Sequence, residues 1–258
     1  MNQLPLHNQA FTISFANQQI ARAVRVHRNV DIALVTHLLG FTEFYPVIFI
    51  SGGASGMSEA DQQHTKTIID GIAQFAEERK AIIIDGGTES GIMKMIGDTR
   101  GTLHYHFPLV GVSPLGRISY PGYTNPRQEA FLEDSHSHFV LVDGEEWGSE
   151  SEMILRLTRA LSGSGTKPAA GVLINGGKIA LREIYLASTK RQKLPIIVLE
   201  GSGRAADEIS TGYRTGQTER TIVQVILSGG DIQLVGTTEG PEVMRQCLIE
   251  KFATKTKE

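Results

Sequence analysis

The sequence has one cysteine, Cys247, among its 258 residues, and it has no long apolar run. A single cysteine excludes an internal disulfide framework and suits a reducing compartment. No apolar stretch approaches the roughly 20 residues that a membrane-spanning helix needs. The amino terminus, MNQLPLHNQAFT, also lacks the basic start and apolar centre of a secretory signal. We therefore expect a soluble, cytoplasmic protein without a membrane contact.

The chain has little net charge. Its formal charge of −3 provides no long-range field that would attract a polyanion. Arginine and aromatic residues are not interleaved as they are in single-strand-binding proteins, so nucleic acid is not an expected partner. With 40% hydrophobic and 21% charged residues, the composition is that of a globular protein with a sizeable core.

Short runs rich in valine and isoleucine recur along the chain, each bounded by turn residues. The runs are PVIFIS (46–51), AIIID (81–85), LVGVS (109–113), HFVLVD (138–143), GVLIN (171–175) and PIIVLE (195–200). Helical periodicity occupies 58–79 and 240–252. Buried strands that alternate with amphipathic helices are typical of parallel pairing with right-handed crossovers. The sequence predicts an α/β fold, with a doubly wound, mostly parallel, Rossmann-like sheet flanked by helices.

The amino-terminal region precedes this repeating pattern. Two apolar-rich stretches within 11–26 flank an Asn-Gln-Gln turn, which indicates a hairpin, and a helix is expected within 30–39. We expect residues 1–40 to form a hairpin-and-helix extension and residues 41–258 to form a single globular unit. Within that unit, 115–135 has no periodicity and predicts a long loop over a strand edge.

Four of the predicted strands run directly into glycine turns. The turns read IFIS-GGASG, IIID-GGTESG, VLIN-GGKI and IVLE-GSGRA. Because parallel strands end at the same edge of a sheet, these turns should converge there, each ahead of a helix N-terminus that favours phosphate. Tight packing of strand on helix would account for any single turn, but four together favour a ligand site. Neither the Rossmann G-x-G-x-x-G nor the Walker pattern is present.

The candidate contacts lie within these turns. Ser55, Thr88 and Ser202 carry short hydroxyls that could donate to a phosphate, although each could instead cap a helix. Arg204 stands at a helix start, where a cation is unfavourable unless an anion lies between. We regard it as the best phosphate clamp, the alternative being an arginine that extends into solvent. The candidate glycines are Gly52, Gly53, Gly86, Gly87, Gly176, Gly177 and Gly203.

Two His-x-His pairs, His104 with His106 and His136 with His138, could each chelate a metal if they lie on one strand face. No cysteine or close carboxylate completes either set, so we assign no metal site and no required cofactor. Cys247 lies on an apolar helical stripe and is expected to be a buried, inert thiol.

The turns and their neighbours resemble the amino-terminal homology region of melastatin-type transient receptor potential channels and its free-standing prokaryotic relatives. The matching stretches are DGGTESGIMKMIG (85–97), GVSPLG (111–116), LEDSHSHFVLVDG (132–144), WGSESE (147–152) and GSGRAADEI (201–209). This SLOG/LSDAT superfamily is also similar to DprA and the LOG phosphoribohydrolases. The resemblance implies that residues 41–258 form a nucleotide-binding domain, with ADP-ribose as the best-known ligand in the channel family.

The same resemblance implies roles for individual residues. The turn from Gly86 to Thr88 would approach the diphosphate and ribose. Trp147 stands where relatives often have an aromatic residue, and it could stack on an adenine. Glu150 occupies the G-x-E position and is expected to lie in the cleft.

A further resemblance concerns catalysis. The LOG phosphoribohydrolases carry P-G-G-x-G-T-x-x-E, and NGGKIALRE (175–183) lies over that pattern. The double glycine and Glu183 match, but the proline, third glycine and threonine are replaced, and the bulky Ile179 should obstruct a phosphate. Glu183 could hold a ribose diol or stabilise an oxocarbenium centre. It could instead be a helix-surface charge or a partner for Arg182 or Lys178.

Three hypotheses follow. The first is a soluble sensor for ADP-ribose or a related NAD-derived nucleotide. The second is a phosphoribohydrolase or NAD-glycohydrolase with Glu183 as the key carboxylate, which the altered LOG pattern makes the weaker alternative. The third is an oligomeric scaffold with a vestigial site. A sensor would pass its state to an effector that the sequence does not identify, and a homo-oligomer is a further expectation.

Overall fold

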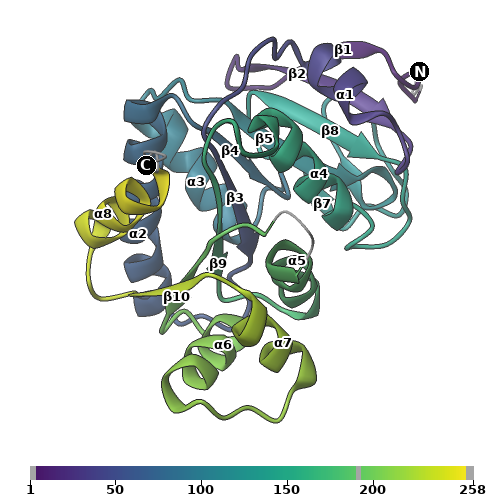
Figure 1. Cartoon of the computed structure of the whole chain (residues 1–258). Coiled ribbons are helices and arrows are strands. Elements are labelled where there is room, and N and C mark those ends of the chain that lie inside the picture. Colours follow the sequence, from purple (N-terminus) through teal and green to yellow (C-terminus); the bar gives the residue numbers. More distant parts are fainter. Residues whose placement is uncertain (1–3, 190–192, 254–258) are drawn as a thin grey trace.

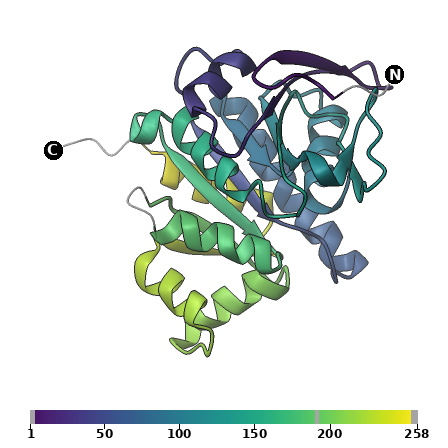
Figure 2. The ribbon, with the colours of Figure 1, turned by 90° about the vertical axis from the view of Figure 1, so that its right-hand side faces the viewer.

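The computed structural model describes residues 4–189 and 193–253. Nine strands form one sheet in the order β1-β2-β8-β5-β4-β3-β9-β10-β11. Figures 1 and 2 show the ribbon in two views at right angles. Within these ranges β1 and β2 pair antiparallel, and the other neighbours pair parallel. The strands are β1 (Ala10–Ser14), β2 (Ile20–Val26), β3 (Val47–Gly52), β4 (Ile82–Asp85), β5 (Leu109–Pro114), β8 (His138–Val142), β9 (Ala169–Ile174), β10 (Ile196–Glu200) and β11 (Ile232–Gly236).

Helices cover both faces of the sheet, as Figure 1 shows for α2 and α8 on one side and α5 on the other. One face packs against α2 (Glu59–Arg79), α3 (Gly91–Thr102) and α8 (Pro241–Phe252). The other packs against α1 (Ile32–Leu39), α4 (Ser151–Leu161), α5 (Lys178–Thr189), α6 (Arg204–Thr215) and α7 (Thr221–Gly229). Strand residues alternate between the two cores, so that Phe49 faces one and Ile48 the other. Because both faces are buried, the strands read as nearly continuous apolar runs.

The order in which successive strands are added to the sheet changes direction in the middle of the sheet. From β3 the chain proceeds through β4, β5 and β8 toward one edge, and it then returns to β9, on the other side of β3, before β10 and β11. The reversal therefore lies between β3 and β9. In open α/β sheets, the crevice for a ligand forms at such a point, beyond the carboxyl ends of the strands. The predicted fold class, a doubly wound and mostly parallel sheet, is confirmed.

Local signals account for the predicted helices. Helix α2 begins with a capping box, in which Ser58 and Asp61 exchange side-chain and backbone contacts, and it ends at Lys80 in a left-handed conformation. Its buried stripe includes Ile68, Ile72 and Phe75, at the spacing of a helix that faces a core. The helices predicted at 58–79 and 240–252 are both present.

The amino-terminal hairpin is also present, and it is joined to the main sheet. Strand β2 pairs in parallel with β8, with Val26 opposite Val142. The prediction of an irregular loop over 115–135 was incomplete. That stretch contains a short 3-10 helix, Leu115–Arg117, and two short strands, β6 (Ile118–Ser119) and β7 (Ala130–Phe131), which pair with each other. No helix in 4–189 or 193–253 has the length and apolar character needed to cross a membrane.

Candidate functional site

A cavity of about 580 Å³ opens at the carboxyl edge of the sheet, beside the reversal between β3 and β9. The end of β3, the turns after β4, β9 and β10, and the loop that leads into α4 all contribute to it. Its volume lies within the range of about 300–1,000 Å³ that is usual for small-molecule sites. The lining residues are Ile50, Ser51, Gly52, Gly86, Thr88, Met93, Trp147, Glu150, Ile154, Gly177, Lys178, Ile179, Ala180, Glu183 and Arg204.

The structure brings together many of the residues that the sequence singled out, from five separate segments. Those that line the cavity are Gly52, Gly86, Thr88, Trp147, Glu150, Gly177, Glu183 and Arg204. Those outside its lining are Gly53, Ser55, Gly87, Gly176, Ser202 and Gly203. The convergence follows from the parallel topology, because every contributing turn follows the carboxyl end of a strand.

Two of the lining glycines have different structural roles. Gly52 has φ +146°, and a Cβ on it would lie 1.8 Å from the carbonyl oxygen of Ile174. This glycine therefore allows β3 and β9 to approach each other closely. A Cβ on Gly177 would instead lie 2.7 Å from a guanidinium nitrogen of Arg204. Gly177 makes room for that side chain at the cavity.

Arg204 is the first residue of α6, and its φ of 49° is a left-handed value that non-glycine residues seldom adopt. Its side chain is exposed, and within the described ranges it makes no hydrogen bond or ion pair with another residue. A cation at a helix N-terminus is unfavourable unless an anion lies near it. The guanidinium is therefore placed to receive an anionic group in the cavity.

The three candidate hydroxyls have different surroundings. The Ser202 Oγ donates to the carbonyl of Leu199 at 2.5 Å and accepts from the N–H of Asn175 at 2.7 Å, so it joins two of the turns. Ser55 is exposed outside the cavity lining. Thr88 is buried at the cavity, with its Oγ1 3.2 Å from the Ser90 Oγ. The alternative role as helix caps is wrong for all three, because the caps of α2, α3 and α6 are Ser58, Ser90 and Gly203.

Glu183 is buried on α5 and faces the cavity. Its carboxylate accepts hydrogen bonds from the Ser51 hydroxyl and, at 2.7 Å, from the Ser151 hydroxyl. Burial raises the pKa of Glu183, and these two hydrogen bonds oppose the rise. The alternative of a helix-surface charge is therefore wrong, because the side chain is only 5% exposed.

Glu150 provides a second carboxyl group in the same cavity. Burial raises its pKa to about 7, and the nearby Glu183 adds to the rise. The N–H of Gly148 donates to Glu150 Oε2 at 2.9 Å, and this hydrogen bond opposes the rise in the pKa of Glu150. At neutral pH the cavity therefore carries less negative charge than two exposed glutamates would give it.

Trp147 lines the cavity from the loop before α4. Its indole N–H donates to the carboxylate of Glu129, which also pairs with Arg117. The indole is thus held by the 115–131 stretch at the wall of the cavity. A fixed aromatic ring at a cavity wall is suited to stacking on a planar group.

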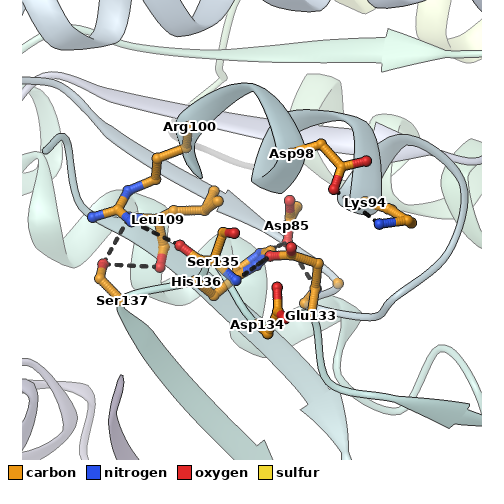
Figure 3. Close-up of polar contacts among 12 residues, drawn as sticks. Asp85, Lys94, Asp98, Arg100, Leu109, Glu133, Asp134, Ser135, His136 and Ser137 are labelled. Carbon is orange, nitrogen blue, oxygen red and sulfur yellow. Dashed lines mark hydrogen bonds and ion pairs between the residues drawn. The ribbon is translucent and has the colours of Figure 1, made fainter. Parts of the chain in front are cut away.

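Beneath the turn after β4, the structure contains a buried ionic cluster that the sequence did not predict. Asp85, His136 and Glu133 point toward one another in Figure 3. His136 Nε2 lies 2.9 Å from Asp85 Oδ1, and His136 Nδ1 lies 2.6 Å from Glu133 Oε2. Asp85 also accepts from the N–H of Gly87 at 2.7 Å, and the N–H of Glu133 donates to the Gly87 carbonyl at 3.0 Å. The cluster therefore fixes the backbone that presents Thr88.

The two histidines of the HSH motif differ in charge. Burial opposes protonation of His136, but the carboxylates of Asp85 and Glu133 outweigh it and raise its pKa to about 9. Burial lowers the pKa of His138 to about 4, and its ring packs 4.8 Å from that of Phe41. His136 is thus a cation at neutral pH, whereas His138 is neutral.

Cys247 is buried on α8, as the sequence predicted. Burial raises the pKa of its thiol to about 11, so the thiol stays protonated at neutral pH. A protonated, buried thiol is a poor nucleophile.

The family model described as SLOG in TRPM, prokaryote, matches residues 45–246. The chain therefore belongs to this family, as its motifs indicated. It is 27% identical over 250 residues to the transient receptor potential cation channel subfamily M member 2 of Rattus norvegicus, covering 80% of this chain and 16% of the channel. It is 24% identical over 241 residues to subfamily M member 6 of Homo sapiens, covering 80% of this chain and 12% of the channel. The chain thus spans only a small part of the length of these relatives.

Proposed function

We propose that this chain is a sensor that binds ADP-ribose or a related NAD-derived nucleotide in the cavity at the carboxyl edge of the sheet. The observation that carries the proposal is the exposed guanidinium of Arg204, which has no partner among the described residues and lies against Gly177 at the cavity. A diphosphate would supply the missing anion. Membership of the SLOG family supports a nucleotide as the carrier of that diphosphate.

The other lining residues suit the remaining parts of such a ligand. The indole of Trp147 offers a stacking surface for a base. Glu150 offers carboxyl oxygens that can accept from ribose hydroxyls. The turn at Gly86 allows close approach of the ligand, because a Cβ there would meet only the flexible side chain of Met93, at 3.8 Å.

The alternative function is cleavage of an N-glycosidic bond. Two carboxyl groups with raised pKa values in one cavity favour it, because such cleavage uses one carboxyl as an acid and another to stabilise positive charge on the sugar. Glu150, with a pKa of about 7, would be the acid, and Glu183 the stabilising carboxylate. Against it, Ser51 and Ser151 already occupy both oxygens of Glu183.

One experiment distinguishes the two functions. ADP-ribose, NAD, AMP and cyclic derivatives are titrated into the protein by calorimetry, and each mixture is then incubated and separated by chromatography. The sensor proposal expects micromolar binding of at least one nucleotide that is recovered intact. Release of free base or nicotinamide would establish the enzyme instead. Absence of binding to every nucleotide would contradict both.

The Glu183→Gln variant sharpens the comparison. A glutamine can still bond both serine hydroxyls, so the cavity should keep its shape. If the chain is a sensor, the variant should bind the nucleotide with similar affinity. If the chain is an enzyme, binding should persist while release of base is lost.

A further inference from the structure

A second cluster of polar side chains lies at the same sheet edge, outside the cavity lining. It consists of His7, His27 and Asp143. His27 directly follows β2 and Asp143 directly follows β8, and these strands are parallel neighbours, with Val26 opposite Val142. The two residues therefore lie side by side. His7 joins them from the segment ahead of β1, through a bridge to Arg25.

Three potential ligand atoms converge in this cluster. His7 Nε2 lies 2.5 Å from Asp143 Oδ2, and His27 Nδ1 lies 2.7 Å from that same oxygen. The two imidazole rings stack with their centroids 4.0 Å apart. All three atoms lie within 4.8 Å of one another, and no other such group of histidine, cysteine or carboxylate side chains occurs in 4–189 or 193–253.

The cluster is more than an ordinary ion pair. Arg25 already neutralises Asp143, with its Nε 2.8 Å from Oδ1. The two imidazoles share the other oxygen, and stacked rings that both carried a proton charge would repel each other. A bound cation would require both rings to be neutral, and it would use their free electron pairs as ligands.

The donor set indicates the class of cation. Two imidazole nitrogens and one carboxylate oxygen suit a borderline transition-metal ion such as Zn²⁺, whereas Mg²⁺ prefers oxygen ligands. Ligands about 2.0–2.1 Å from a tetrahedral Zn²⁺ lie roughly 3.3 Å apart, so each imidazole nitrogen would need to move less than about 1 Å away from Asp143 Oδ2. The side chain of His27 is 66% exposed and can make that adjustment. Arg25 would hold the second carboxylate oxygen and orient Asp143.

The geometry points to a site for one Zn²⁺-like ion at His7, His27 and Asp143, with water completing the coordination. The bound ion would tie the segment ahead of β1 to the ends of β2 and β8. This inference rests on residues that the proposed nucleotide site does not use, so either can fail without the other.

The test uses untagged, metal-stripped full-length protein titrated with ZnCl₂ by calorimetry, together with thermal unfolding. His27→Gln removes one ligand on the surface. His106→Gln is the matched control, because His106 also neighbours a carboxylate, with its Nδ1 3.7 Å from Glu77 Oε1, but belongs to no group of three potential ligands in 4–189 or 193–253.

The unsubstituted protein and His106→Gln should each bind one Zn²⁺, and His27→Gln should bind it at least about tenfold more weakly. At about 100 times the dissociation constant, Zn²⁺ should raise the unfolding midpoint of the first two proteins by roughly 5–10 °C. MgCl₂ should have no such effect. Absence of Zn²⁺ binding at micromolar levels, or equal affinity in His27→Gln, would overturn the inference.

Discussion

The buried imidazolium of His136 should make the stability of this protein depend on pH above neutrality. Its folded-state pKa of about 9 exceeds the value of 6.5 for an unperturbed histidine. Because the pKa of His136 is raised on folding, its contribution to stability is fully present below about pH 6.5 and is lost as the pH rises through about 9. The shift of about 2.5 units corresponds to about 3 kcal/mol of unfolding free energy.

The assay is urea unfolding at pH 6.5, 8 and 9.5. Between pH 7 and 9 the free energy of unfolding should fall by about 1 kcal/mol for each pH unit through this one group. In His136→Gln the neutral amide leaves Asp85 and Glu133 without a cation, so we expect a loss of about 3–5 kcal/mol at pH 6.5 and a much flatter profile.

His138→Gln is the matched control. Its imidazole, with a pKa of about 4, is already neutral throughout this range, so the variant should keep the slope of the unsubstituted protein. Parallel pH profiles for the unsubstituted protein and His136→Gln would refute the assignment of a buried imidazolium. Should His136→Gln fail to fold, an NMR titration of His136 in the unsubstituted protein tests the same point, and a pKa below 7 would refute it.

Two further predictions concern the cavity. Gly52→Ala should destabilise the fold by about 3 kcal/mol or more, because its Cβ would strike the Ile174 carbonyl. Gly53→Ala, with no atom within 4 Å of its Cβ, should change the midpoint of urea unfolding little. Equal midpoints for the two variants would contradict this prediction. Nucleotide affinity should fall as the pH rises through about 7, because Glu150 then ionises and its carboxylate repels an anion. The affinity should fall by up to about tenfold for each unit by which the bound nucleotide raises the pKa of Glu150. Calorimetry at pH 6 and 8 should show this loss in the unsubstituted protein and not in Glu150→Gln, and a loss of the same size in both would contradict the role of Glu150.

The sequence predicted the buried strands and the turns at their ends well, because a doubly wound sheet imposes both patterns locally. It did not predict α7, whose sequence TIVQVILSG is rich in residues that favour strands. Packing of Val223 and Ile226 into the core beside α5 and α6 outweighs that preference.

Part of the candidate site was predictable from the sequence, because the doubly wound sheet imposes a local strand–turn–helix pattern. Arg204, Thr88 and Glu183 were identifiable because each occupies a fixed place in a strand–turn–helix unit. The environment of Glu183 was not identifiable, since its serine partners come from β3 and α4.

Contacts between segments that are distant in the sequence account for the remaining features. His136 meets Asp85, 51 residues away in the chain, only because β4 and β8 both neighbour β5. His7 and His27 lie far from Asp143 in the sequence, so their spacing gives no sign that the three residues meet. Their approach to Asp143 depends on the parallel pairing of β2 with β8.

Calorimetry with ADP-ribose tests most directly whether an anion of a nucleotide binds at Arg204. Arg204→Ala should weaken binding by about 1.5–3 kcal/mol, or roughly 10- to 150-fold, the range for hydrogen bonds to a charged group. Arg182→Ala is the control, because it removes the same charge from the neighbouring helix without touching the cavity lining. We predict micromolar affinity for the unsubstituted protein and Arg182→Ala and a marked loss for Arg204→Ala. Equal affinity in all three proteins, or no binding by any, would contradict the account.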